Sequence, residues 1–105
     1  MNQDINRLLM ELERLMRAVN REVINPQIKE LSIEDMRPAL CMVANARARY
    51  LKAFFELGAS TDGDEPTDTQ LADLTRLRVE YSELSKAAKA LETARQRGYI
   101  DVKQS

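Results

Sequence analysis

The 105-residue chain contains no histidine and a single cysteine, Cys41. Without histidine the chain has no Cys–His nucleophile and no zinc site that uses a histidine ligand. One cysteine cannot form an internal disulfide, so Cys41 is expected to be a partly buried structural thiol in a protein of a reducing compartment. No motif for a cofactor or for catalysis is visible, and the chain is predicted not to be an enzyme.

Glycine and proline are also scarce, with three of each, so long irregular segments are not expected. No apolar run approaches the roughly 20 residues that a membrane span needs. The first residues do not have the design of a signal peptide, and we therefore expect a cytoplasmic protein that makes no membrane contact. The net charge of −1 gives no overall attraction to nucleic acid or to anionic membranes.

Apolar residues recur at steps of three and four in three segments, which predicts three amphipathic helices. No strand pattern appears, so the sequence predicts one all-α domain over residues 1–105. Its expected parts are a helix at about 3–24, a connection at 25–32, a helix at about 33–57, an acidic loop at 58–66, a helix at about 67–97 and a tail at 98–105.

Local signals set the expected ends of these helices. The residue before a proline avoids helical geometry, so Asn25-Pro26 should end the first helix. The segments 32–35 and 67–70, Ser-Ile-Glu-Asp and Thr-Asp-Thr-Gln, resemble capping boxes that open the second and third helices. Gly58 and Gly98 are the expected terminators of these two helices. The tail is apolar enough at Tyr99, Ile100 and Val102 to dock.

The three helices are predicted to form a coiled-coil-like unit, with an antiparallel hairpin of the second and third helices and the first helix packed alongside. The apolar residues of the third helix repeat with a period near 3.5. That helix should be about 45 Å long against about 33 Å for the others, so part of its apolar row overhangs. The overhang is covered either by the connection at 25–32 or by a second copy of the chain. We expect the second copy, in a homodimer that forms a larger helical bundle. The candidate interface residues are Leu84, Ala88, Leu91, Met10 and Met42.

Arg47 is the most unusual residue of the second helix, because it falls near the middle of the apolar side. A buried guanidinium needs a carboxylate, several carbonyls or a bound anion. Three alternatives follow for Arg47. It forms an intramolecular ion pair, or its aliphatic part covers the core while the guanidinium reaches water, or it binds a carboxylate of a ligand or partner. Arg47 and Tyr50 are therefore a candidate buried charge or ligand site. Tyr50, Phe54 and Phe55 form an aromatic cluster that is expected in the core.

A row of arginines lies opposite the apolar side of the first helix and is the candidate nucleic-acid face. Phosphate backbones bind such rows. The alternative is a solvated face, because Glu11 and Glu13 lie at favourable helical spacing for local ion pairs. The members of the row are Arg7, Arg14, Arg17 and Arg21.

Four acids in the loop and after it, Asp62, Asp64, Glu65 and Asp68, do not match the spacing of a calcium-binding loop. They are interpreted as a solvated acidic turn, and no metal site is predicted.

These patterns favour a small protein–protein interaction module without catalytic activity, such as an adaptor, a chaperone-like protein or an assembly subunit, with an unknown protein partner. One alternative is a nucleic-acid-associated regulator that uses the arginine row. Another is a ligand sensor or enzyme built around Arg47. Fold class by itself does not decide among them.

Overall fold

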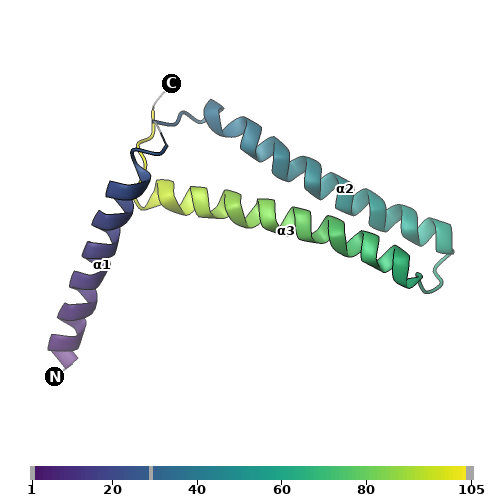
Figure 1. Ribbon diagram of the computed structural model, residues 1–105, viewed down its shortest axis with the longest axis horizontal. Helices are drawn as coiled ribbons and strands as arrows, with labels where there is room; N and C mark the ends of the chain where they lie inside the picture. The colour runs from purple at the N-terminus through teal and green to yellow at the C-terminus, as the bar shows by residue number, and fades with distance from the viewer. Residues whose placement is uncertain (1, 29, 104–105) are drawn as a thin grey trace. The chain divides into compact units, whose positions relative to one another are not determined.

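The computed structural model of the chain describes residues 2–28 and 30–103. They form three α-helices and a short 3-10 helix, which confirms the all-α prediction (Figure 1). Two compact units are present, the terminal unit formed by Met1–Met36 with Leu91–Ser105, and the hairpin unit formed by Arg37–Ala90. The elements are α1 (Asn2–Ile24), the 3-10 helix η1 (Glu34–Met36), α2 (Arg37–Thr61) and α3 (Asp68–Gln96).

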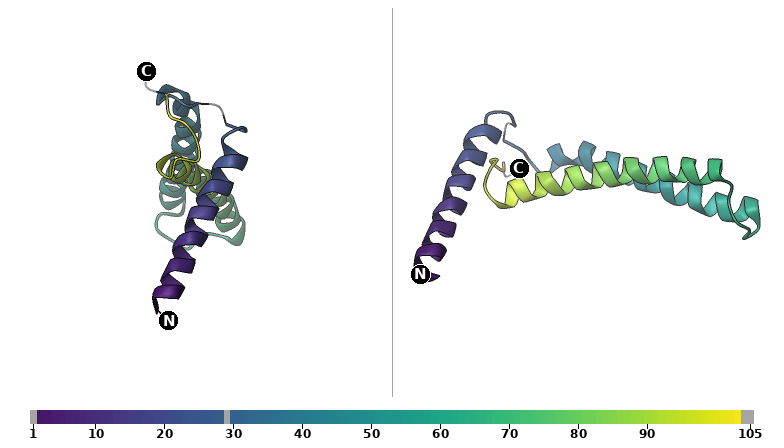
Figure 2. Two further views of the ribbon diagram at one scale, coloured as in Figure 1. Left: turned by 90° about the vertical axis from the view of Figure 1, so that its left-hand side faces the viewer. Right: turned by 60° about the horizontal axis from the view of Figure 1, so that its bottom comes forward.

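The hairpin unit consists of α2 and of α3 up to Ala90, which lie side by side and antiparallel (Figure 1 and the right-hand view of Figure 2). This arrangement confirms the predicted hairpin. Ala46 is 1% exposed, and its small side chain lets the two helices approach closely. Larger apolar side chains of the two helices, including Leu57 and Leu77, are only half-buried. The hairpin therefore has a thin core.

A capping box opens the segment that leads into α2, as predicted. The Asp35 N–H donates to the Ser32 hydroxyl at 3.1 Å, and the Ser32 N–H donates to a carboxylate oxygen of Asp35 at 2.8 Å. Hydrogen bonds to the Asp35 carboxylate, first from the Ser32 backbone N–H and then from the Ser32 side chain, are the main reason why the pKa of Asp35 is lowered. Pro38 follows in the first turn of α2, where a missing N–H breaks no intrahelical bond.

The predicted end of α2 at Gly58 is wrong, because the helix continues through Gly58 to Thr61. The left-handed residues that end it are Asp62, with φ of 53°, and Gly63, with φ of 83°. Gly63 N–H donates to the carbonyl of Gly58 at 3.2 Å, and Asp62 N–H donates to that of Ala59 at 3.4 Å, a Schellman arrangement. A single glycine costs a helix only about 1 kcal/mol, so Gly58 alone does not stop it.

Both ends of α3 follow the sequence signals. Gln70 N–H donates to the Thr67 hydroxyl at 3.1 Å, and Thr67 N–H donates to the Gln70 side-chain oxygen at 2.8 Å. Gly98, with φ of 74°, ends the helix, and Tyr99 N–H donates back to the carbonyl of Ala94 at 2.9 Å. The prediction of Gly98 as the terminator is confirmed.

The tail after Gly98 docks within the terminal unit. Tyr99 and Ile100 are buried together with Ala94 of α3. Two backbone hydrogen bonds, 3.0 and 2.6 Å long, and one parallel β-bridge join Leu31 to the segment around Val102. The expected docking of the tail is confirmed, although the Val102 side chain stays largely exposed.

α1 contrasts with the tail, because none of the described residues of this helix is buried. The packing of the first helix alongside the hairpin therefore stays a prediction. Within residues 2–28 and 30–103, no helix has the length and hydropathy that crossing a membrane requires.

Candidate functional site

The apolar residues of α1 form a continuous exposed row along the whole helix, which we call the α1 apolar face. Each of its side chains is between 46% and 65% exposed. Scattered exposed apolar residues are ordinary, whereas a contiguous row of them marks an interaction surface. The α1 apolar face consists of Ile5, Leu8, Leu9, Leu12, Leu15, Met16, Val19 and Val23.

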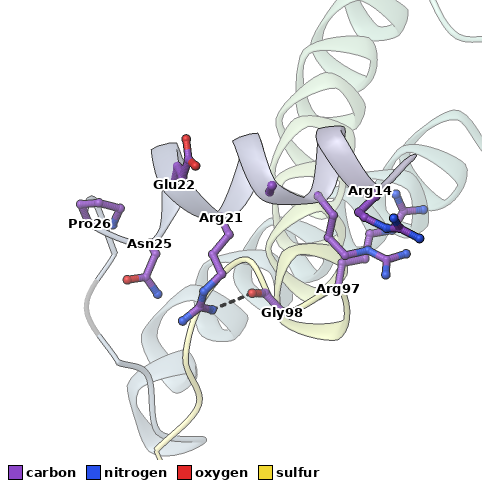
Figure 3. Close-up of a pocket in the computed structure, with 9 residues that line it drawn as sticks. Arg14, Arg21, Glu22, Asn25, Pro26, Arg97 and Gly98 are labelled. Atoms are coloured by element: carbon purple, nitrogen blue, oxygen red, sulfur yellow. Dashed lines mark hydrogen bonds between the residues drawn. The ribbon is translucent and has the colours of Figure 1, made fainter. Parts of the chain in front are cut away.

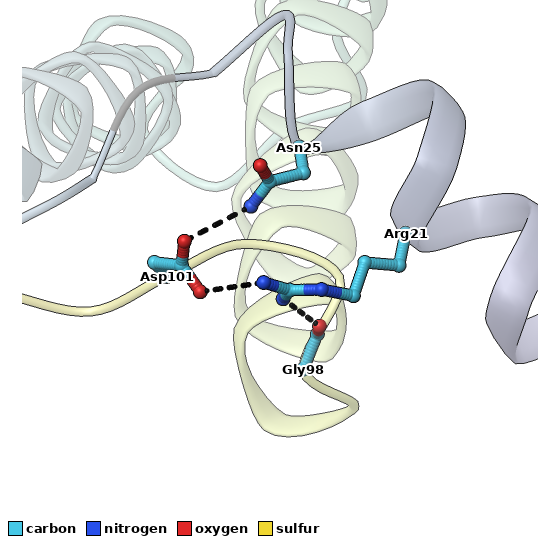
Figure 4. Close-up of polar contacts among 4 residues, drawn as sticks. All are labelled: Arg21, Asn25, Gly98 and Asp101. Carbon is cyan, nitrogen blue, oxygen red and sulfur yellow. Dashed lines mark hydrogen bonds and ion pairs between the residues drawn. The ribbon is translucent and has the colours of Figure 1, made fainter.

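The tail contacts α1 on its polar side. Arg21 donates from Nη1 to the carbonyl of Gly98 at 2.7 Å and from Nη2 to Oδ1 of Asp101 at 2.9 Å (Figure 4). The Asn25 amide donates to Oδ2 of the same carboxylate at 3.3 Å. The hydrogen bond from Arg21 is the largest of the effects that lower the pKa of Asp101. Because the tail occupies the polar side, the α1 apolar face stays open.

Three arginines of α1 and one arginine beyond α3 line a hollow in the terminal unit, about 610 Å³ in volume (Figure 3). We call it the arginine hollow. Glu22 is the one acidic residue among its lining residues, and Figure 3 shows its carboxylate directed away from the guanidinium groups. The arginines are Arg14, Arg17, Arg21 and Arg97.

Among the residues that the structure describes, the ion pairs are Arg21–Asp101, Lys52–Glu56 and the pair of Glu92 with Arg95. Arg14, Arg17 and Arg97 take part in none of them. The row predicted on the first helix is therefore divided, since Arg21 holds the tail while Arg14 and Arg17 border the hollow. Arg7 lies outside this hollow.

Sequence reasoning missed Arg97, because nothing in the local pattern relates residue 97 to a helix that ends at residue 24. Its position next to the helix terminator Gly98 was the one available signal. Arg97 also borders Tyr99, and its hydrogen bond is the first cause of the lowered pKa of the Tyr99 hydroxyl. Asn20 adds a second hydrogen bond, and the charges of Arg97 and Arg17 act in the same direction.

Arg47 is exposed, which corrects the expectation of a buried charge. Its Nε and Nη2 donate to the Tyr81 hydroxyl at 3.1 and 2.9 Å, and its Cζ lies 5.2 Å from the centroid of the Tyr81 ring. Tyr50 stacks on the same ring, with centroids 6.3 Å apart. Within the described chain no carboxylate joins this cluster. The long Arg47 side chain reaches water at the margin of the hairpin, so its charge needs no buried partner.

The five candidate interface residues differ in their solvent exposure. Leu84, Ala88 and Leu91 of α3 are half-buried, whereas Met10 and Met42 are exposed. The uncovered apolar surface therefore lies on α1 and α2 more than on α3.

Three residues of α2 expected to be at least partly buried are exposed. Phe54 and Phe55 are predicted in the core, and this prediction is wrong. Phe55 is 79% exposed, because a two-helix hairpin covers only one side of α2. Cys41 is exposed for the same reason.

The acidic turn has a structural role at one position, because Asp62 adopts the left-handed conformation that ends α2. Short polar side chains tolerate this conformation better than most residues do. In the described part of the chain, no group of three or more histidine, cysteine, aspartate or glutamate side chains is arranged to hold a metal ion.

Comparisons of the chain with protein-family models, with curated proteins and with solved structures find no match.

Proposed function

We propose that this chain is a protein–protein interaction module without catalytic activity, which assembles with a second copy of itself through the α1 apolar face. The observation that supports this proposal is that eight apolar side chains follow one side of α1 while none of the described α1 residues is buried. A helix with one fully apolar side is stable in water when that side packs against a partner. The dimer would serve as an adaptor or assembly subunit in a reducing compartment, where the exposed Cys41 thiol stays reduced.

The energy available from covering this face is large. Full burial of a leucine, isoleucine, valine or methionine side chain contributes roughly 1.5–3 kcal/mol, and about half of each side chain here is still exposed. Each residue therefore offers about 1 kcal/mol, and the two faces of a dimer together offer on the order of 16 kcal/mol. Association costs about 4–15 kcal/mol in lost freedom, so the gain is of the size that a dimer needs.

The charges of α1 favour a second copy in antiparallel orientation. Residues 2–13 carry Asp4, Glu11 and Glu13 against Arg7, a net charge of −2. Residues 14–24 carry three arginines against one glutamate, a net charge of +2. The arginines lie on the side opposite the α1 apolar face, so they act across the dimer at longer range and not as direct ion pairs. Antiparallel pairing brings each negative half near a positive half, whereas parallel pairing brings like charges together. A surface that complements itself in this way is what a two-fold symmetric dimer requires.

The assembly is tested by sedimentation equilibrium of the full chain over a range of concentrations. We expect a monomer–dimer equilibrium that becomes weaker as salt is added, because the long-range attraction between the exposed charges of α1 is screened. A chain that stays monomeric up to about 0.5 mM, the range of very weak association, contradicts the proposal.

Orientation is tested by the distance between spin labels on a Gln3→Cys, Cys41→Ser variant. At about 1.5 Å per residue, an antiparallel dimer places the two labels roughly 30 Å or more apart, whereas a parallel dimer brings them within about 20 Å. The short distance would refute the charge argument. A Glu11→Lys, Glu13→Lys variant, whose α1 is positive along its whole length, should dimerise less well than the unmodified chain at low salt.

A further inference from the structure

The arginine hollow has an excess of positive charge that the described part of the chain does not neutralise. Four arginines and one glutamate line it, and the charge of Arg21 is answered by Asp101. Arg14, Arg17 and Arg97 are left without a carboxylate partner among the described residues. The remaining charge of the lining is thus +2, which matches a doubly negative group.

Two of these arginines come from different segments and line the same hollow. Figure 3 shows the side chains of Arg14, from α1, and Arg97, from the end of α3, directed to the same part of the hollow. Like charges brought together in this way repel each other unless an anion lies between them. The folding of the chain therefore produces an arrangement that an anion would stabilise.

The position of Arg97 is held by the tail contacts. Arg21 binds the Gly98 carbonyl at 2.7 Å, directly after Arg97, and Tyr99 is buried next to it. Arg97 and Asn20 both form hydrogen bonds with the Tyr99 hydroxyl, and these bonds lower its pKa. Arg97 is thus fixed relative to α1 before any ligand arrives, which reduces the entropy cost of binding.

From this geometry we propose that the arginine hollow binds a phosphate group, with Arg14, Arg17 and Arg97 as its ligands. The planar guanidinium donates two parallel hydrogen bonds to phosphate oxygens, and several converging arginines suit a phosphate better than a single carboxylate. The group comes either from a small phosphate compound or from the backbone of a nucleic-acid strand. In the second case the strand would continue along α1 to Arg7, which lies one heptad before Arg14 and outside the hollow.

The test uses the full chain and two probes, inorganic pyrophosphate and a short single-stranded oligonucleotide, with binding measured by calorimetry at low salt. We expect Arg14→Gln, Arg97→Gln to weaken pyrophosphate binding at least about tenfold, because two of the three guanidinium groups without a carboxylate partner are lost. Arg7→Gln is the matched control on the same helix and should leave pyrophosphate binding unchanged. If Arg7→Gln and the hollow variant (Arg14→Gln, Arg97→Gln) both lose oligonucleotide binding, the phosphate group belongs to a nucleic-acid strand. If the hollow variant alone loses binding, the phosphate group belongs to a small compound.

The proposal is overturned if neither probe binds at low salt, or if the hollow variant binds both probes as well as the unmodified chain. Helix content by circular dichroism and dimer mass by light scattering are measured on each variant, so that failed assembly is distinguished from failed binding. If the double variant does not fold, Arg17→Gln alone tests the same site, and an unchanged affinity for both probes there also refutes it.

Discussion

The two central leucines of the α1 apolar face provide the sharpest test of the assembly. Replacing Leu12 and Leu15 by alanine removes apolar surface. Alanine is the strongest helix former, so the helical propensity of α1 is not weakened. Leu12 is 49% exposed and Leu15 is 60% exposed in the chain alone, so their substitution disturbs little within one copy.

The magnitude follows from that exposure. About half of the roughly 1.5–3 kcal/mol of a buried leucine is still to be gained on assembly, or about 1 kcal/mol for each side chain. A dimer contains four such leucines, so the double variant should lose about 4 kcal/mol of association free energy. Since about 1.4 kcal/mol corresponds to a factor of ten, the dissociation constant should rise roughly a thousandfold.

Sedimentation equilibrium of the unmodified chain and of Leu12→Ala, Leu15→Ala measures this change directly. Ile33→Ala is the matched control, because Ile33 is 77% exposed in the same unit but lies outside α1. It should leave the dissociation constant unchanged. If the α1 double variant dimerises within about fivefold of the unmodified chain, less than about 1 kcal/mol, the α1 apolar face is not the interface.

Three further predictions concern the fold. Arg21 lowers the pKa of Asp101 below its ordinary 3.8, so the ion pair stabilises the docked tail fully above pH 3.8 and less as the pH falls through the lowered pKa. Hydrogen exchange of the tail amides should show this loss of protection in acid. Asp101→Asn should abolish the pH dependence. Thr67→Ala should cost about 1 kcal/mol in denaturant unfolding through the lost cap of α3, and no change would contradict that role. Gly98→Ala should destabilise the protein by about 1 kcal/mol or more, since φ is 74°. Gly58→Ala should stabilise it by about 0.5–1 kcal/mol, since Gly58 is helical and an added Cβ would meet open space. A destabilised Gly58→Ala variant would indicate that Gly58 ends the helix.

The helix ends show how far local signals reach. The capping boxes at Ser32 and Thr67 were predictable, because both partners of each hydrogen bond lie within four residues of each other. The prediction at Gly58 is wrong, because a glycine ends a helix only when it adopts the left-handed conformation itself. That conformation occurs four residues later, at Asp62.

The candidate sites were predictable only in part. The arginine row of α1 was visible as a helical repeat, but Arg97 was not, because it joins the hollow through the fold of the tail. In the same way, the apolar position of Arg47 was visible, whereas its partner Tyr81 lies 34 residues away on the other helix of the hairpin. Helical periodicity predicts which residues of one helix share a face, but it does not predict which residues of another helix contact them.

The sequence by itself determined three helices, their caps, and the separation of apolar and arginine-rich sides on α1. These features depend on hydrogen bonds and periodicities within a few residues, which the order of amino acids specifies directly. The tertiary structure alone decided that the tail docks on the polar side of α1, through Arg21 contacts that span 77 and 80 residues. That choice leaves the apolar face of α1 uncovered and brings Arg97 to the hollow that Arg14 lines, because long-range contacts depend on how whole segments pack and not on any local pattern.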